Sequence, residues 1–177
     1  MDAAAAKRIL RQGLPLTDTR VVGSLTLRQH GVRDLIDSPI LIKNCLLDDL
    51  DAGFIEFEAP VVLENVEVVG TCLFHACCFL AGFSARDCHF RSRVDLQWRG
   101  HNKNGSLFRI ENSQFDGFVD FEDAWFMGPV IVRGCAFHGG ANLLGMRGQP
   151  NQVTFDVEPI IEFNTGRLDL DKAPAAN

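Results

Sequence analysis

Three consecutive stretches of the chain repeat one pattern: Phe-Asp-Gly-Phe-Val-Asp-Phe at residues 115–121, Phe-Met-Gly-Pro-Val-Ile-Val at 126–132 and Phe-His-Gly-Gly-Ala-Asn-Leu at 137–143. Each stretch has apolar or small residues at its first, fifth and seventh positions, and a new stretch begins every 11 residues. Alternation over the fifth to seventh positions places two side chains on one face of a short strand. The pattern predicts a chain that turns a corner every five or six residues and directs one set of apolar side chains inward.

The same spacing recurs toward the N-terminus. Apolar or small residues occupy the equivalent positions in six further units: Val21/Leu25/Leu27, Ile36/Ile40/Ile42, Phe57/Val61/Leu63, Val68/Cys72/Phe74, Phe79/Phe83/Ala85 and Phe90/Val94/Leu96. Alternating steps of five and six residues are too irregular for one helix and too short for a helical hairpin. They favour an all-β chain in which each passage lies beside the previous one.

A second signal fixes the length of one coil, meaning one full turn of the chain around the long axis. A charged residue, a turn-forming residue and a small residue recur about every 22 residues, as Lys43-Asn44-Cys45, Glu64-Asn65-Val66, Arg86-Asp87-Cys88, Glu111-Asn112-Ser113 and Arg133-Gly134-Cys135. Parallel stacking of coils would align the charges as an outward ladder of alternating sign. The central Asn, Asp and Gly residues are types that tolerate a left-handed corner.

These residues also carry a family resemblance. A small residue two places before each Phe or Leu, with Phe-x-Gly-x-Val-x-Phe between corners, resembles the Phe-rich, looser branch of the pentapeptide-repeat proteins, over roughly residues 21–148. The resemblance implies a right-handed, four-sided parallel β-helix with stacked Phe side chains inside. It also implies that some relatives look like duplex DNA and bind type II topoisomerases. The alternating charges of this chain are a poor match to a DNA duplex.

The repeat divides the chain into three parts. Residues 1–20 form an N-terminal capping segment with a short helix predicted over 2–12, residues 21–148 form the β-helix, and 149–177 form a C-terminal cap with a loose tail after Arg167. Both caps are expected because an open solenoid exposes strand edges and core at its ends. Two insertions, at 28–35 and 99–105, are predicted to bulge out as loops.

Composition excludes several classes of function. The 177-residue chain has a net charge of -6 and a pI near 5.3, which disfavours direct nucleic-acid binding. No apolar run has the length of a membrane span, so we expect a cytoplasmic protein with no membrane partner. Its six cysteines are expected to be reduced core residues, and their spacing predicts no metal site and no disulfide. We also expect no cofactor, because no phosphate-binding glycine motif is present.

One cluster of acidic residues is a candidate for catalysis. Asp95 and Asp120 are predicted at the same outward position one coil apart, with Glu122 two residues further on. Glycoside hydrolases use two carboxyl groups that lie roughly 5 to 9.5 Å apart, and residues in neighbouring coils can have this separation. Acidic residues are, however, expected on any solvated face of an acidic solenoid. We therefore predict no catalytic residues and keep a carbohydrate-active enzyme as an alternative.

Outward aromatic residues suggest a partner surface. Large side chains at corner or outward positions lie near a small basic group, and the proposed surface comprises Trp98, Arg99, His101, Lys103, Phe118 and Trp125. A terminal segment that folds over the aromatics would explain them equally well. The leading expectation is a non-enzymatic protein-binding or scaffold module. The alternatives are a DNA-mimic modulator of a type II topoisomerase and a protein that self-assembles as a homodimer or end to end.

Overall fold

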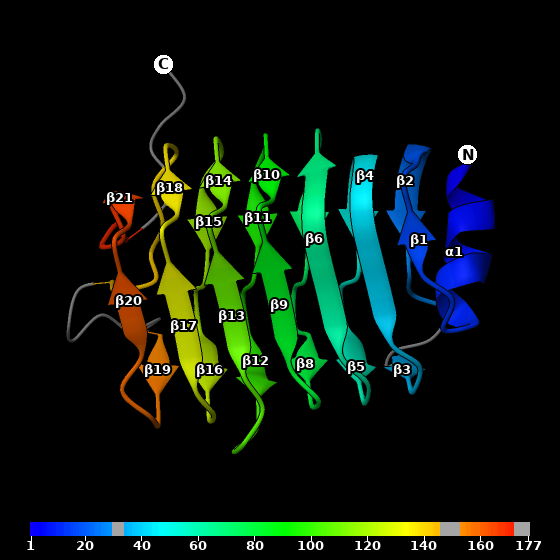
Figure 1. The fold of residues 1–177 in the computed structure, drawn as a ribbon. Coiled ribbons are helices and arrows are strands. Elements are labelled where there is room, and N and C mark those ends of the chain that lie inside the picture. The colour runs from blue at the N-terminus through cyan, green and yellow to red at the C-terminus, as the bar shows by residue number, and fades with distance from the viewer. Residues whose placement is uncertain (30–33, 146–152, 172–177) are drawn as a thin grey trace.

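The chain folds into a parallel β-solenoid of about five turns, with about 22 residues in each coil. The structure is a computed structural model, and it describes residues 1–29, 34–145 and 153–171. One helix, α1 (Ala3–Arg11), lies at the N-terminal end of the stack, and the final strands lie at the opposite end (Figure 1). The predicted all-β solenoid with a 22-residue coil is therefore confirmed.

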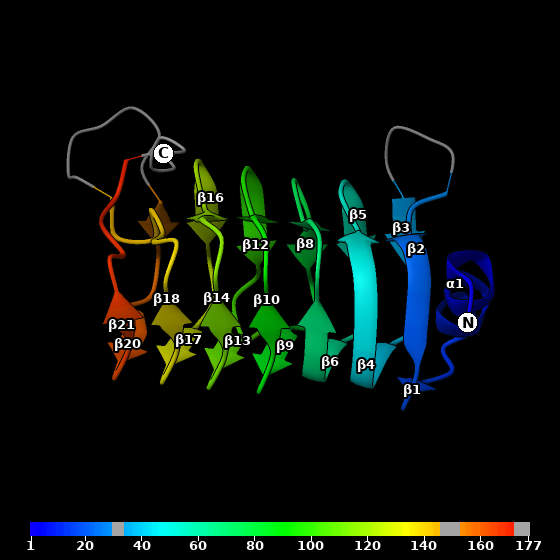
Figure 2. The same ribbon diagram turned by 90° about the horizontal axis from the view of Figure 1, so that it is seen from above.

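Each central coil contributes one short strand to each of four faces, and the coils lie side by side along the axis (Figure 2). The first face contains β1 (Leu16–Thr17), β4 (Ile40–Asp51), β6 (Val61–Val68), β9 (Phe83–Arg86), β13 (Phe108–Glu111), β17 (Val130–Arg133) and β20 (Ile160–Glu162). The second face contains β2 (Arg20–Thr26), further parts of β4 and β6, β10 (His89–Phe90), β14 (Gln114–Phe115), β18 (Ala136–Phe137) and β21 (Thr165–Gly166).

The two remaining faces are narrower. The third contains the ends of β2 and β4, followed by β7 (Cys72–Leu73), β11 (Val94–Asp95) and β15 (Val119–Asp120). The fourth is built from two groups of strands, β3 (Asp34–Ile36), β5 (Ile55–Phe57) and β8 (Cys78–Phe79), then β12 (Arg99–Asn102), β16 (Ala124–Phe126) and β19 (Thr154–Phe155). All of these pairings are parallel, as expected for stacked coils.

A left-handed residue makes the corner between the first and second faces in every coil. Its φ angle lies between 51° and 64° at all seven positions, Asp18, Asn44, Asn65, Asp87, Asn112, Gly134 and Phe163. Short polar side chains reduce the steric cost of positive φ, and these also bond to one another along the axis. Asn65 donates to the Oδ1 of Asn44 at 3.0 Å, and Asn44 donates to Asp18 at 2.9 Å. The predicted corner chemistry is confirmed.

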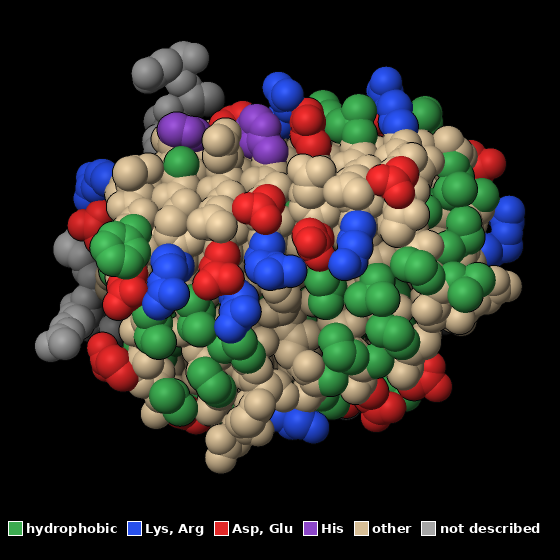
Figure 3. All heavy atoms as spheres, in the orientation of Figure 1, with side chains coloured by type: hydrophobic (Ala, Val, Ile, Leu, Met, Phe, Trp, Pro, Cys, Tyr) green, Lys and Arg blue, Asp and Glu red, His purple; other side chains and the backbone are tan. Residues whose placement is uncertain are grey.

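The charge ladder lies beside this corner. Parallel pairing aligns Lys43 with Glu64, Glu64 with Arg86, Arg86 with Glu111, and Glu111 with Arg133. Figure 3 shows the resulting row of alternating basic and acidic side chains, with hydrophobic side chains below it. Ion pairs join Glu64 to Lys43 at 2.9 Å and to Arg86 at 3.5 Å. The ladder continues one step beyond the prediction, because Arg133 pairs with Glu162 at 3.1 Å.

Stacked Phe side chains and small residues fill the interior. Phe90, Phe115 and Phe137 form one stack with ring centroids 5.0 and 4.8 Å apart and nearly parallel planes. The residue after each left-handed corner turns inward, where only a small side chain fits. At Cys45, Cys88, Ser113 and Cys135 the thiol or hydroxyl donates to the carbonyl two residues earlier, as in Cys88 to Arg86 at 3.2 Å. Five of the six free cysteines are buried, in agreement with their predicted role as core residues.

The ends differ from the predicted boundaries in one respect. Helix α1 caps the first coil as expected, with Ala6 and Leu10 fully buried against it and Asp2 as its N-cap. Residues 149–163 were predicted as a final irregular strand and cap; β19, β20 and β21 pair in parallel with the previous coil and extend the solenoid to Gly166. The tail residues 172–177 lie outside the described residues.

The insertion at 99–105 is only partly a loop. Residues 99–102 form β12 in the fourth face, and the register against β16 shifts between Gly100 and Asn102. His101 is therefore the extra residue of a β-bulge, and both it and Asn102 are fully buried. Only residues 103–105 turn outward. In the other insertion, residues 30–33 lie outside the described residues, while 34–35 belong to β3.

Candidate functional site

The corner between the third and fourth faces has unusual residues. It is also left-handed, but its four positions carry Phe54, Ala76, Trp98 and Asp123, with φ between 53° and 64°. Bulky aromatic residues rarely adopt positive φ, because Cβ then approaches the next carbonyl oxygen at a cost of about 1–2 kcal/mol. Phe54 and Trp98 are 41% and 50% exposed. The solenoid therefore tolerates a strained backbone while exposing two large rings.

A histidine joins these two rings into a continuous row. The His75 ring lies 5.1 Å from the Phe54 ring and 4.8 Å from the Trp98 ring, measured between centroids. We call Phe54, His75 and Trp98 the aromatic ridge. At its N-terminal end the guanidinium of Arg28 lies over the Phe54 ring, with the Cζ atom 5.6 Å from the centroid. The ridge thus runs parallel to the solenoid axis and already holds one cation against an aromatic face.

Acidic side chains flank the ridge on both adjoining faces. On the third face, the Oδ1 of Asp95 lies 3.4 Å from the Nδ1 of His75, and Asp51 occupies the equivalent position two coils earlier. Asp123 is exposed at the corner itself. On the fourth face, Glu56 follows Phe54 by two residues. The surroundings of the ridge therefore favour a positively charged ligand.

The carboxylates considered for catalysis are engaged in the solenoid wall. Asp95 and Asp120 are aligned as predicted, but Asp120 is only 6% exposed. It accepts hydrogen bonds from Arg93 at 2.5 Å, Gln97 at 2.8 Å and Asn142 at 2.8 Å, and from the backbone N–H of residue 122 at 3.1 Å. Asp95 likewise accepts from the Gln97 N–H at 3.0 Å. Both carboxylates stabilise turns in the wall.

The structure separates the six residues predicted to form a partner surface. Trp98 is exposed on the ridge, Lys103 is exposed on the turn after β12, and Trp125 is 45% exposed on β16. Trp125 lies in the coil after Trp98, and its indole N–H donates to Asp156 at 2.8 Å. Arg99 lies in β12, next to Trp98 in the chain. A C-terminal strand thus contacts Trp125 without covering it.

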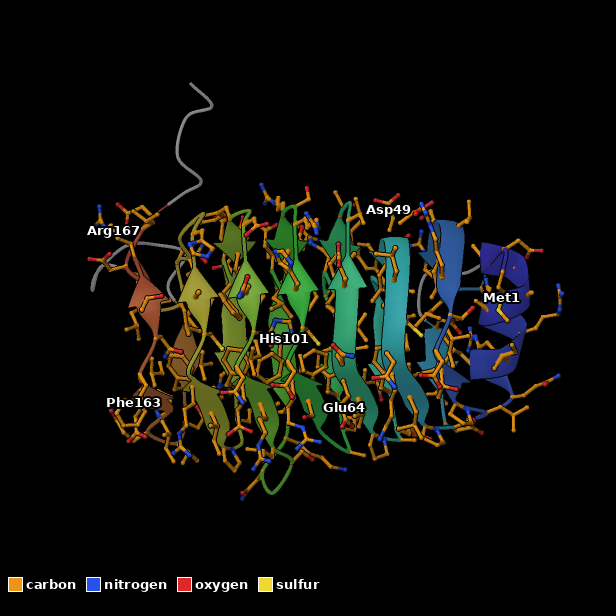
Figure 4. The ribbon with its side chains drawn as sticks, turned by 45° about the horizontal axis from the view of Figure 1, so that its top comes forward. Met1, Asp49, Glu64, His101, Phe163 and Arg167 are labelled. Atoms are coloured by element: carbon orange, nitrogen blue, oxygen red, sulfur yellow. The ribbon has the colours of Figure 1, made fainter. Side chains whose placement is uncertain are left out.

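Two of the six residues were placed wrongly. Phe118 was expected to point outward but is only 6% exposed. The equivalent residue of the next coil is Gly140, and the Leu170 side chain lies where a side chain at that position would be. His101 was also expected on the surface, whereas the bulge turns it inward, as Figure 4 shows.

His101 fills the core at the bulge. Its ring packs 5.3 Å from Phe126, and its nitrogens face the carbonyl oxygens of Cys77, at 3.2 Å, and Leu96. Burial lowers the pKa of His101 to about 4, although both carbonyls favour its charged form. The imidazole is therefore neutral at neutral pH, and its place in the core excludes it from a partner surface.

The sequence also offered a signal for the residues that the prediction missed. Phe54, Ala76, Trp98 and Asp123 recur at the coil period, so Phe54 could have been aligned with Trp98. The tripeptide of the first corner is the more regular signal, and Phe54 was not assigned to a corner. The contact of His75 with both rings depends on its position one residue before a corner.

Thiol and metal chemistry have little support in the described part of the chain. No group of three or more His, Cys, Asp or Glu side chains there converges as a metal site. Burial raises the pKa of the Cys88 thiol to about 11 and that of Cys72 well above its usual value, which keeps both protonated. The described residues also contain no helix long and apolar enough to cross a membrane.

Comparison with known proteins gives no match. No protein-family model fits the chain, and neither a curated protein nor a solved structure is found to be similar to it. Function is therefore inferred from the geometry of the aromatic ridge and its surroundings.

Proposed function

We propose that the chain is a non-enzymatic protein-binding module whose aromatic ridge binds a Lys- or Arg-bearing segment of a partner protein. The observation that carries this proposal is the exposure of Phe54 and Trp98 at strained left-handed corners. The same corner carries Ala76 and Asp123 in other coils, so the solenoid itself requires no ring there. Strained, exposed residues are concentrated at binding sites.

The chemistry of the expected partner follows from the contacts of the ridge. Arg28 shows that a guanidinium fits against Phe54. The faces of Trp98 and His75 continue that row, and Asp95 and Asp123 supply negative charge beside it. Aromatic rings next to carboxylates bind Arg and Lys through cation–π contacts and charge attraction. A basic segment lying along the axis would contact several coils at once.

Two rival functions have less support. Asp120 is buried and saturated with donors, so the carboxylate pair lacks the access that a glycoside hydrolase requires. The charge ladder alternates in sign along the axis, whereas a DNA mimic would present a uniformly negative surface. The resemblance to pentapeptide-repeat proteins supports a scaffold role without naming a partner.

A displayed library of random dodecapeptides tests the proposal. The library is panned separately against the wild-type chain, a Phe54→Ala, Trp98→Ala variant and a Phe163→Ala control. Phe163 is a suitable control because it is also an exposed ring at a left-handed corner, but on the other corner of the solenoid. Far-ultraviolet circular dichroism verifies that all three proteins are folded.

We expect the wild type and the Phe163→Ala control to enrich the same Arg- and Lys-rich peptides, and the ridge variant to lose them. Enrichment of the same peptides by the ridge variant would contradict the proposed site. Failure of the wild type to enrich any basic sequence would contradict the proposed partner chemistry.

A further inference from the structure

The two ends of the solenoid differ in how they are closed. At the N-terminal end, α1 covers the first coil, so that the inward residues Leu16, Val21 and Leu25 are at most 2% exposed. At the other end, β19, β20 and β21 pair only with the preceding coil within the described residues. Figure 1 shows these strands as the last layer. The backbone of the last coil therefore presents a strand edge that can accept a further strand.

The side chains of this edge are arranged for continued stacking. Phe155 and Ile161 point inward but are half-buried, whereas Phe126 and Val132, with which they are aligned, are fully buried. The Phe155 ring stacks on Phe126 at 5.3 Å, which leaves its other face toward the open end. An added strand would cover these apolar surfaces in the same way as each coil covers the previous one.

The charge ladder specifies what the added strand should carry. It alternates in sign from Lys43 to Glu162, and Glu162 is paired on one side by Arg133. Its side chain is 49% exposed. A strand that continued the pattern would place Lys or Arg opposite Glu162. Opposite charges stabilise directly facing positions of neighbouring strands, and like charges destabilise them.

A second copy of the chain fits this edge poorly. The last coil, residues 153–171, contains five acidic residues and one basic residue, Asp156, Glu158, Glu162, Asp169, Asp171 and Arg167. Two such edges brought together would repel each other. Stacking of this edge on the N-terminal end of another copy is blocked by α1. Neither mode of self-association continues the ladder.

We infer that the C-terminal edge formed by β20 and β21 accepts an extended strand from a partner protein, with apolar residues facing the core and Lys or Arg opposite Glu162. This interaction is β-strand addition, in which backbone hydrogen bonds supply affinity and alternate side chains supply specificity. It goes beyond the proposed function, because it uses a different surface. It does not depend on the aromatic ridge.

A pair of peptides tests the inference. The first has the sequence of residues 126–137, which contains the strand β17. In the register of β17 on β20, its Arg133 would lie opposite Glu162. The second is identical except that Glu replaces this Arg. Binding of each peptide to the full-length chain and to its Glu162→Lys variant is measured by titration calorimetry. Amide hydrogen exchange in Ile160–Glu162 reports whether the peptide lies on β20.

We expect the wild type to bind the Arg peptide roughly tenfold more tightly than the Glu peptide, and Glu162→Lys to reverse this preference. Protection of the β20 amides should accompany binding. The Phe54→Ala, Trp98→Ala variant should bind the Arg peptide as the wild type does, which separates this site from the ridge.

Three results would overturn the inference. They are equal affinity for both peptides, no binding to the full-length chain, and binding without protection of β20. Sedimentation of the wild type as a dimer that Ile160→Asp converts to a monomer would place a second copy on the edge and would equally overturn it.

Discussion

Single corner residues determine where each coil turns, and two of them determine what the surface can bind. Asn, Asp and Gly at the first corner adopt positive φ at low steric cost, as at Asn44 and Asn65. Phe54 and Trp98 adopt the same conformation at a higher cost. Phe163 also adopts it at the first corner, so what sets Phe54 and Trp98 apart is the row of rings that they form with His75.

Substitution of Asn65 tests the role of the left-handed corner. Asn65→Ala should lower the free energy of unfolding by about 1–2 kcal/mol, because Ala is strained at positive φ and loses the hydrogen bond to Asn44. Asn65→Gly should lower the free energy of unfolding by less, since Gly adopts this φ freely. Urea denaturation compares the two. Equal losses would show that the corner conformation is not the source of the effect.

The charge ladder predicts a titration at Glu64. The hydrogen bond from Lys43, then its charge, and then Arg86 lower the pKa of the Glu64 carboxyl below its usual value. A lowered carboxyl pKa contributes stability above the pKa of the unfolded chain, and this contribution is lost as the pH falls through the lower folded value. Carbon-detected NMR should show the low midpoint, and Lys43→Met should raise it. A matched Lys103→Met control should leave it unchanged; a shift there would argue against the local cause.

The buried His101 predicts a second pH dependence of stability, which arises from burial of the side chain and not from ion pairing. Burial lowers the pKa of His101 to about 4, so the folded chain keeps it neutral while the unfolded chain takes up a proton below about pH 6.5. The contribution of the neutral, buried His101 to the free energy of unfolding is complete above about pH 6.5. It falls by up to roughly 3 kcal/mol as the pH decreases toward 4. The difference in stability between wild type and His101→Gln should therefore shrink over this range.

An exposed histidine supplies the control for that measurement. His138→Gln is the matched substitution at a histidine whose side chain is exposed. If the stability difference between wild type and His101→Gln is constant from pH 7 to pH 4, His101 is not buried as a neutral group.

At the level of elements, α1 closes the solenoid and the bulge in β12 absorbs an extra residue. Leu10→Ala should cost about 2–5 kcal/mol, because it creates a cavity between α1 and the first coil. Hydrogen exchange should accelerate mainly in β1 and β2, since each coil contacts only its neighbours. Leu14→Ala, at a residue that is 52% exposed, is the control and should change stability by less than about 0.5 kcal/mol. A similar loss in both variants would contradict the capping role of α1.

The sequence predicted elements where the repeat is regular and failed where an element absorbs an irregularity. Inward residues such as Phe115 and Val119 could be predicted because alternation and coil length independently place them inside. The extra residue at 99–105 offered two solutions, an outward loop or a bulge within the strand. The bulge gives the buried imidazole of His101 the carbonyl oxygens of Cys77 and Leu96 as hydrogen-bonding partners. No local sequence pattern reveals these partners.

The candidate surface was predictable only in part for the same reason. Trp98 and Trp125 were correctly placed outside because their positions in the repeat correspond to a corner and to an outward strand position. Phe118 was misplaced because its position in the repeat indicated an outward side chain, whereas the structure buries it. The row from Arg28 through Trp98 arises from contacts between residues of successive coils, and no pattern within one coil predicts these contacts.

The described residues form a rod that α1 closes at one end, with a strand edge at the other end and a ridge of aromatic residues along one corner. Such a rod suits the display of a linear binding surface, because its spacing is fixed by backbone pairing over several coils. The ridge and the C-terminal edge are distinct surfaces. A scaffold with both can bind two partner segments without a change in fold.

The ridge can be tested directly by tryptophan fluorescence with a defined probe. In Trp125→Phe, Trp98 is the sole tryptophan, and in Trp98→Ala, Trp125→Phe, Phe163→Trp the sole tryptophan stands at the other corner. Both variants have the same net charge, so non-specific attraction is matched. An Arg-Gly dodecapeptide is titrated into each, with a Glu-Gly dodecapeptide as the reference. A saturable change in the first variant alone, with the Arg peptide alone, is predicted; equal responses from both variants, or none from Trp98, would contradict binding at the aromatic ridge.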